Sequence, residues 1–332
     1  MIGVMLWWAW QDQADYYDTT GGVYEKFHSG SPDANQRIAI IDVTGVIVDG
    51  YSVHQQIKRI EDDDRIVAVV LRVESPGGTV TGSDYIYHYL QQFRRESKLP
   101  LVVSMGSMAT SGGYYVSMSV GEQEDVIFAE PTTITGSIGV VLPHYDVSAF
   151  MERFDIRDDS IRSHPNKQML SMTRSMTPEQ RAIIQAEVDA SFERFKRVVL
   201  QGRPALRRGQ DPSPPADALP PAKVRLVAED GEQDLATGQV FSAQEAVRFG
   251  LVDRIGFLED AIDRAAELAN VTLDEVRVVR LEKPKPLIEL PALIREEGSA
   301  SVVALLTRPT VSRCWYLSGS APPLLPMRYE FD

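Results

Sequence analysis

Cysteine is nearly absent from this chain of 332 residues, which contains only Cys314. A single cysteine can form neither a disulfide within the chain nor a cysteine-based zinc site, so the fold depends on its hydrophobic core. Basic residues are too few to balance the acidic ones, 34 against 47, which leaves a formal net charge of −13. This charge repels polyanions and argues against nucleic acid as a partner. The content of 43% hydrophobic and 24% charged residues is that of an ordinary globular protein.

A long hydrophobic run is also missing from the beginning of the chain. Residues 1–10 are apolar, but a spanning helix needs ~20 apolar residues, and the first basic residue, Lys26, comes too late for a signal peptide. The three tryptophans in this segment are typical of a membrane-water interface. We interpret residues 1–36 as a membrane-proximal segment that contains either the exit end of a spanning helix or an interfacial anchor. A frayed terminus is the simpler alternative.

Short apolar runs alternate with helical patterns from residue 37 onward. The run 38–43 precedes a helical stretch at 52–63, and the run 66–73 precedes a longer one at 80–97. This alternation is typical of βαβ units, so we predict an α/β fold with a parallel sheet flanked by helices and a helical C-terminal part. Further strands are expected at 101–105, 126–129, 138–141 and 275–281, and further helices at 147–154, 178–200, 242–249 and 257–270. The acidic run 61–64 is interpreted as a solvated turn.

Two segments interrupt this pattern. Six prolines fall between Pro204 and Pro221, a density that excludes helix and central strand, so we expect an exposed insertion loop at 202–232. The stretch from Ser299 onward is typical of a tail that becomes ordered on a partner surface. We therefore divide the chain into residues 1–36, a domain at 37–282 and a C-terminal tail at 283–332.

Glycine-rich turns follow two of the predicted strands. Residues 74–78, Glu-Ser-Pro-Gly-Gly, follow the strand that ends at Val73, and residues 108–115 follow the strand that ends near Met105. Open α/β sheets bind ligands at the carboxyl ends of their parallel strands, where glycine lets a backbone N–H approach a substrate. Ser111 in the second turn is either a helix N-cap or, with a base nearby, a nucleophile.

The sequence offers few candidates for such a base. None of its five histidines belongs to a His-Glu-x-x-His zinc motif, and no phosphate-binding G-x-x-x-x-G-K is present, so neither a metal nor a cofactor is expected. Lys167 is the single lysine between Lys98 and Lys196. A lysine becomes a base when burial against apolar groups lowers its pKa, whereas a solvated surface cation is the simpler interpretation. We expect Lys167 to be partly buried after the extended stretch 160–163.

Four motifs follow one another along the chain. They are Ser75-Pro76-Gly77-Gly78, then Ala109 to Tyr115, then Glu130 to Val140 with Thr135-Gly136-Ser137, and last Gly238 to Ala246 with Gly250-Leu251-Val252-Asp253. Together they resemble the signal peptide peptidase A family of serine proteases, family S49. The resemblance runs from about Arg37 to Leu268, and it implies a ClpP/crotonase-like fold and a Ser-Lys dyad.

The resemblance also implies roles for five residues. Ser111 would be the nucleophile, Lys167 the general base and Ser137 a hydroxyl that orients the lysine, while the N–H groups of Gly78 and Gly112 would form the oxyanion hole. Family members usually have a glycine three residues before the lysine, whereas this chain has His164-Pro165-Asn166 before Lys167. Proline fixes the angle at which the backbone approaches, which can compensate for the missing glycine.

The activity implied by the resemblance is that of a serine endopeptidase which hydrolyses remnant signal peptides or other unfolded apolar peptides. The chain has one copy of each motif and no internal repeat, and the resemblance implies that such single-unit chains form a homo-oligomeric ring. The dyad would be completed either within one chain or between neighbours. We expect the N-terminal segment to associate with the cell membrane, with the peptidase domain at 37–282 on the extracytoplasmic side.

Three alternatives stay open. A crotonase-like acyl-CoA enzyme would share the glycine-rich turns, but it needs neither a serine at the start of a helix nor the lysine. A non-catalytic scaffold or binding member of the fold is consistent with the altered residues before Lys167. A ClpP-like Ser-His-Asp site would use His144, which follows Ser111 by 33 residues.

Overall fold

The computed structural model describes residues 22–208, 224–226, 233–283 and 315–317. Within them, one sheet runs in the order β1-β12-β2-β3-β5-β6-β11, and β5 also pairs with β7, which pairs with β10. Its strands are β1 (Tyr24–Gly30), β2 (Gln36–Thr44), β3 (Ile66–Ser75), β5 (Leu101–Thr110), β6 (Ile127–Ala129), β7 (Ile134–Gly136), β10 (Val240–Ser242), β11 (Arg254–Ile255) and β12 (Val276–Glu282). Only β1 and β10 are antiparallel to their neighbours within this sheet. The predicted α/β fold with a mostly parallel sheet is confirmed.

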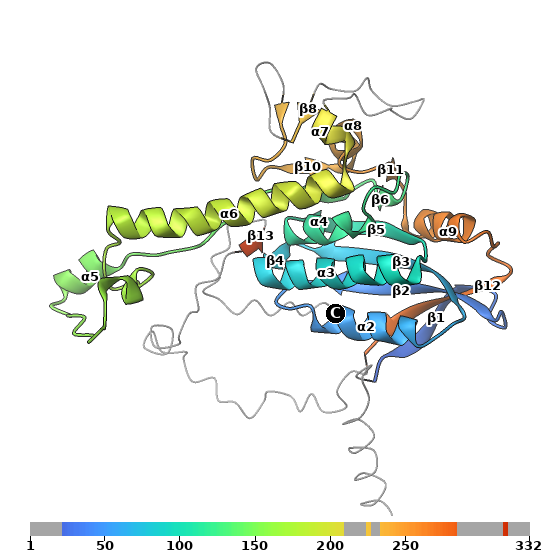
Figure 1. Ribbon diagram of the computed structural model, residues 1–332, viewed down its shortest axis with the longest axis horizontal. Coiled ribbons are helices and arrows are strands. Elements are labelled where there is room, and N and C mark those ends of the chain that lie inside the picture. Colours follow the sequence, from blue (N-terminus) through green and yellow to red (C-terminus); the bar gives the residue numbers. More distant parts are fainter. Residues whose placement is uncertain (1–21, 209–223, 227–232, 284–314, 318–332) are drawn as a thin grey trace, which may run out of the picture.

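Helices flank the sheet. α2 (Tyr51–Glu61) and α3 (Val80–Ser97) lie side by side along it, and α9 (Leu258–Leu268) packs against β3 and β5 (Figure 1). The other helices are α4 (Gly112–Ser117), α5 (Ser148–Arg153), α6 (Pro178–Gly202), α7 (Ala205–Arg208) and α8 (Ala243–Arg248), with 3-10 turns η1 (Met118–Val120) and η2 (Pro165–Gln168). All six predicted helices are present, with their ends within two residues of the expected positions.

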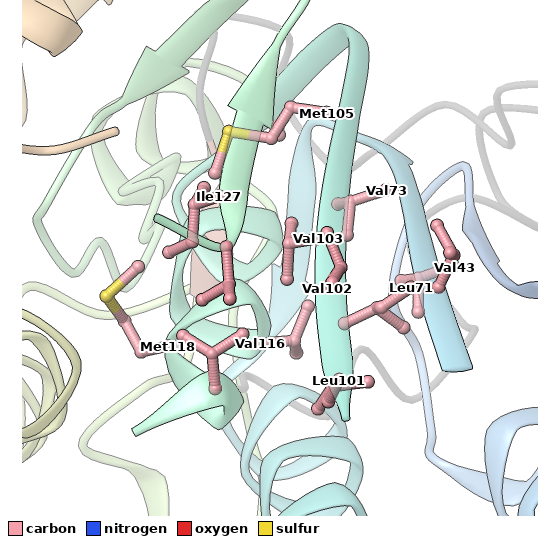
Figure 2. Packing of buried hydrophobic residues seen from close by; sticks show 14 of the residues in the cluster. Val43, Leu71, Val73, Leu101, Val102, Val103, Met105, Val116, Met118 and Ile127 are labelled. Carbon is pink, nitrogen blue, oxygen red and sulfur yellow. The ribbon is translucent and has the colours of Figure 1, made fainter. Parts of the chain in front are cut away.

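The hydrophobic core covers both faces of the sheet. Residues 38–41 of β2 and 68–71 of β3 are consecutive and completely buried. Because successive strand residues point to opposite faces, both faces must be covered by other elements. Figure 2 shows part of this core, in which Leu71, Val103 and Val116 come from β3, β5 and α4.

Three details differ from the expectations. β5 continues to Thr110 because its last residues pair with β7, so residues 108–110 are strand rather than turn. The run 138–141 forms no strand, because residues 134–136 occupy the place between β5 and β10. α7 lies inside the proline-rich stretch, where helix was excluded, because Pro204 precedes its first turn and a missing N–H is tolerated there.

The ends of the chain fall partly outside the described residues. The apolar residues 1–10 are among those outside, and β1, from the predicted segment 1–36, is an edge strand of the sheet. In the part of the chain that is described, no helix is both long enough and apolar enough to span a membrane. Of the predicted tail, the structure describes Lys283 and a short strand, β13 (Trp315–Leu317).

The acidic run 61–64 is not wholly solvated, contrary to expectation. The side chain of Asp63 is 3% exposed and accepts hydrogen bonds from Arg65 Nε at 2.7 Å and from Arg37 Nη1 at 3.1 Å. The bond from the Arg65 side chain lowers the pKa of Asp63 to about 2. The Asp63 carboxylate therefore connects the turn after α2 to Arg37 of β2 and acts as a clamp between them.

Asp63→Asn tests this clamp through its pH dependence. The pKa of Asp63 in the folded chain lies below the ordinary value of 3.8, so its ionised form stabilises the fold above about pH 4 and this contribution disappears as the pH falls through about 2. We expect the substitution to lower the free energy of unfolding by about 2 kcal/mol at pH 6, and by much less near pH 2. Urea denaturation at both pH values measures this, with the exposed Asp64→Asn as control. Equal losses at both pH values would contradict the clamp.

An arm projects from this body. Residues 139–179 include no buried residue, and α5 and the first half of α6 extend away from the sheet, to the left in Figure 1. The second half of α6 packs on the body through the buried Phe195, Val198 and Val199, and the Phe195 ring contacts the Tyr115 ring of α4 at 5.2 Å between centroids. The arm therefore has no core of its own and depends on the base of α6 for its position.

A buried ion pair fixes that base. Arg203, directly after α6, donates from Nη1 to Asp253 Oδ1 at 2.6 Å and from Nε to the Leu251 carbonyl at 3.1 Å. Asp253 Oδ2 also accepts the N–H groups of Val126 and Ile127, both at 2.8 Å. Burial opposes ionisation of Asp253, but the Arg203 guanidinium together with the Ile127 and Val126 N–H groups outweighs it, so the pKa of the carboxyl is lowered. The pair thus joins the arm, the start of β6 and the segment before β11.

Arg203→Met should destabilise the chain strongly, because it leaves the Asp253 carboxylate buried without its cation. We expect a loss of about 3–5 kcal/mol in the free energy of unfolding, measured by urea denaturation. Arg254→Met is the matched control, since Arg254 pairs with Asp125 at a side chain that is 57% exposed, and it should cost less than about 1 kcal/mol. Similar losses of unfolding free energy in both variants would show that the buried pair stabilises the fold no more than an exposed pair does.

Candidate active site

Ser111 stands at the junction of β5 and α4 in a strained conformation. Its backbone has φ 55 and ψ −114, a combination that side chains other than glycine rarely adopt. The Ser111 N–H donates to the Gly136 carbonyl at 2.8 Å, and its carbonyl accepts the Tyr115 N–H at 2.8 Å. The residue is 1% exposed, and its hydroxyl forms no hydrogen bond with any described residue. The two backbone hydrogen bonds thus hold Ser111 in this conformation without using its hydroxyl.

Ser137 lies beside Ser111 because of the pairing between β5 and β7. Thr110 is opposite Gly136 in this parallel pair, so the two serines follow directly from neighbouring strand ends. Ser137 also has a positive φ, 54, and its N–H donates to the Gln239 carbonyl at 2.7 Å. The late Gly238–Ala246 motif therefore supports Ser137 from the other side through β10.

Gly78 and Gly112 approach each other closely. A Cβ on Gly112 would lie 3.1 Å from the Gly78 nitrogen and 2.4 Å from Ser83 Oγ. A Cβ on Gly78 would lie 1.9 Å from the Ile47 carbonyl oxygen, so only glycine fits at position 78, in the short strand β4 (Gly77–Thr79). Two backbone N–H groups are thus gathered next to the Ser111 turn, which is the arrangement that an oxyanion hole requires.

Lys167 does not join this group. It is exposed in η2, which is tied to the beginning of α6 by a hydrogen bond from Gln180 Nε2 to the Pro165 carbonyl at 3.2 Å. From Gln180 to Phe195, where α6 meets α4, the helix rises ~22 Å at 1.5 Å per residue. The expected partial burial of Lys167 is wrong, because the neighbouring apolar residues of the arm have no core to enter.

His144 belongs to the arm as well. Its Nε2 donates to the Ser171 carbonyl at 3.1 Å, within the segment that has no buried residue. Of the residues singled out in the sequence, the structure therefore brings together Ser111, Ser137, Gly78 and Gly112, and it leaves both candidate bases on the arm. Gly136 and Gln239 belong to the motifs found in the sequence, but sequence reasoning gave them no role: their carbonyls hold the two serines through long-range contacts that no local pattern signals.

The sequence matches peptidase family S49 over residues 93–208 and 222–272. It is 35% identical over 255 residues to a Synechocystis protein named "Putative protease slr0021", with 76% of this chain and 82% of the other covered. The chain belongs to peptidase family S49. Its α/β architecture is accordingly of the ClpP-like type, and the family supports a serine protease.

Two further relatives agree with this family. The chain is 30% identical over 261 residues to a protein of Enterococcus faecium named "Putative signal peptide peptidase SppA", covering 74% of this chain and 68% of the relative. It is 32% identical over 248 residues to "Protease 4" of Salmonella typhi, where the match covers 72% of this chain but 36% of the much longer relative.

The strain at Ser111 predicts a difference between two variants that both lack the hydroxyl. Ser111→Gly relieves the unfavourable φ, whereas Ser111→Ala keeps it, so we expect the glycine variant to be more stable by about 1–2 kcal/mol in spite of its more flexible unfolded chain. Urea denaturation of the two variants measures the difference. A glycine variant that is less stable than the alanine variant would show that the turn is not strained.

Proposed function

We propose that this S49 member is a serine endopeptidase in which Ser111 attacks the peptide carbonyl and Lys167 of a neighbouring copy is the general base. The observation that carries the proposal is the strained, buried turn that holds Ser111 beside the Gly78 and Gly112 backbone. The exposed position of Lys167 on a coreless arm supports a site completed between chains, because an arm of this kind needs a second surface.

The proposed chemistry follows from this arrangement. Neutral Lys167 takes the Ser111 proton while Oγ forms the bond to the carbonyl carbon, and the Gly78 and Gly112 N–H groups hold the negative oxygen. Loss of one such donor typically costs about 3–4 kcal/mol in the barrier. The lysine ammonium then protonates the leaving amine, and water activated by the same lysine hydrolyses the acyl-enzyme. Ser137, next to Ser111, would orient the lysine.

Assembly, substrates and location are parts of the same proposal. Large apolar side chains are exposed on the arm, with exposures of 61% for Phe150, 59% for Phe154 and 103% for Ile161, and a ring of copies would cover them. Substrates would be remnant signal peptides or other extended apolar peptides that add a strand beside β4. The name of the Enterococcus relative supports this class. The apolar residues 1–10 support association with the cell membrane, with the peptidase domain on the extracytoplasmic side.

A non-catalytic scaffold is the second candidate, and the separation of Lys167 from Ser111 within one chain favours it. The two candidates make opposite predictions for mixed assemblies. A scaffold has no activity to recover, whereas a shared dyad allows two inactive variants to complement each other.

Ser111→Ala and Lys167→Ala should each lower kcat/KM on an unfolded protein by at least about a thousandfold, because the two groups act as one unit. In a ring assembled from equal amounts of both variants, about a quarter of the sites pair an intact Ser111 with an intact neighbouring Lys167, so about a quarter of the wild-type activity should return. Co-expression followed by a peptidase assay measures this.

Two controls give this experiment its meaning. The double variant Ser111→Ala/Lys167→Ala mixed with either single variant should recover nothing. Arg157→Ala removes another cation of the arm, 85% exposed, and should keep full activity. No recovery, with both single variants inactive, would place the dyad within one chain. An active Lys167→Ala variant that loses activity only on His144→Ala would move the base to the histidine.

A further inference from the structure

Ser75, the first residue of the motif at 75–78, has no role in the chemistry proposed above. It is the last residue of β3 and is completely buried. Its hydroxyl donates to the Gly45 carbonyl at 2.6 Å and accepts the Gly77 N–H at 3.1 Å. One buried hydroxyl therefore connects the loop after β2 to the turn that leads into β4.

The loop after β2 also determines the direction of the Gly78 N–H. In this loop, the Ile47 N–H donates to the Gly77 carbonyl at 2.9 Å. The peptide bond between Gly77 and Gly78 is trans, so its carbonyl and its N–H point in opposite directions. The Gly78 N–H, one of the two proposed oxyanion donors, therefore points away from Ile47. Its direction is fixed as long as Gly77 keeps its orientation relative to this loop.

The backbone of the turn does not fix this orientation by itself. Gly77 has φ 99, and glycine is the residue with the most rotational freedom. Pro76 offers no N–H that could hold the turn from within. Gly77 is held instead by both of its polar groups, since its N–H donates to the Ser75 hydroxyl and its carbonyl accepts the Ile47 N–H.

Ser75 lies against the helix that follows the nucleophile as well. A Cβ on Gly113, two residues after Ser111, would lie 2.9 Å from the Ser75 carbonyl oxygen and 3.4 Å from Ser75 Cβ. The main chain of α4 therefore packs directly on Ser75. This residue thus contacts both parts of the proposed site, the turn with the oxyanion donor and the beginning of α4.

We propose that Ser75 is a positioning residue of the oxyanion hole, whose hydroxyl holds the Gly78 N–H in line with the carbonyl that Ser111 attacks. The inference rests on the proposed function. Ser75→Ala would leave the buried Gly77 N–H without its acceptor, and a glycine released from one of two hydrogen bonds can rotate. The position of β4 should be kept, because the Thr79 N–H still donates to the Ile47 carbonyl at 2.7 Å.

The first measurement does not depend on catalysis. In the Ser111→Ala chain, the added Ser75→Ala should accelerate hydrogen-deuterium exchange of the Gly77 amide at least about tenfold. Ser104→Ala is the matched control, because Ser104 is equally buried but its hydroxyl accepts Arg72 Nη1 on β3, at 2.9 Å. It should leave the exchange of Gly77 unchanged. An unchanged rate in the Ser75→Ala chain would overturn the inference and leave the proposed function intact.

The second measurement compares two inhibitors of the chain with an intact Ser111. A peptide aldehyde accepts the Ser111 oxygen at its carbonyl carbon, and its carbonyl oxygen then occupies the oxyanion hole, whereas the matching peptide alcohol binds through its peptide part alone. Ser75→Ala should raise the inhibition constant of the aldehyde at least about tenfold and that of the alcohol less than about twofold. Ser104→Ala should change neither constant.

Inhibition constants do not depend on the fraction of folded protein, so a loss of stability cannot imitate this result. If Ser75→Ala does not fold, Ser75→Cys keeps a side chain of similar shape with a weaker donor and acceptor, and it should still weaken the aldehyde more than the alcohol. Equal weakening of both inhibitors, or an unchanged aldehyde constant, would overturn the inference. A parent chain that binds the aldehyde no more tightly than the alcohol would refute the proposed function, and with it the role of Ser75.

Discussion

The pairing of β5 with β7 is the interaction on which the site depends. Its register sets Thr110 opposite Gly136, and the hydrogen bond from the Ser111 N–H to the Gly136 carbonyl then fixes the turn that carries Ser111. Ser111 and Ser137 both have a positive φ, an arrangement that costs of the order of 1–3 kcal/mol for each residue. Neither serine would keep this conformation in an isolated segment. Two strands from distant parts of the sequence impose it, which explains why the strain survives folding.

The long helices and central strands could be predicted from the sequence, because their apolar periodicity continues for many residues. α3 begins and ends where its pattern does, and Thr79 caps it by accepting the Gly82 N–H at 3.0 Å. β4 and β7 could not be predicted in this way. Each has three residues, and each is a strand because a neighbour supplies hydrogen bonds and not because its residues favour extended structure. The buried Asp63 was missed for the same reason, since its partner Arg37 lies far away in the sequence.

The positions of the candidate site residues could likewise be predicted only in part. The motifs predicted a group of Ser111, Ser137, Gly78 and Gly112, and the geometry brings these four together. The two serines follow the paired strands β5 and β7, and Gly112, which begins α4, lies against Gly78 of β4. The place of Lys167 could not be predicted, because local apolar neighbours do not bury a lysine when the segment around it has no core. Burial is a property of the surface that finally covers a segment. Within the described part of one chain, no such surface buries any of residues 139–179.

The arm and β4 are each held by neighbouring elements in a way that restricts the proposed site. Arg203 and Asp253 hold the base of α6 firmly, so the arm can present Lys167 only in directions that a rigid helix allows. On β4, Ile47 uses one edge, so the Gly78 backbone groups face the other edge, where β13 pairs. Backbone hydrogen bonds recognise extended conformation and not side-chain identity. Under the proposed function, selection among extended peptides at this position must therefore depend on side-chain contacts next to β4.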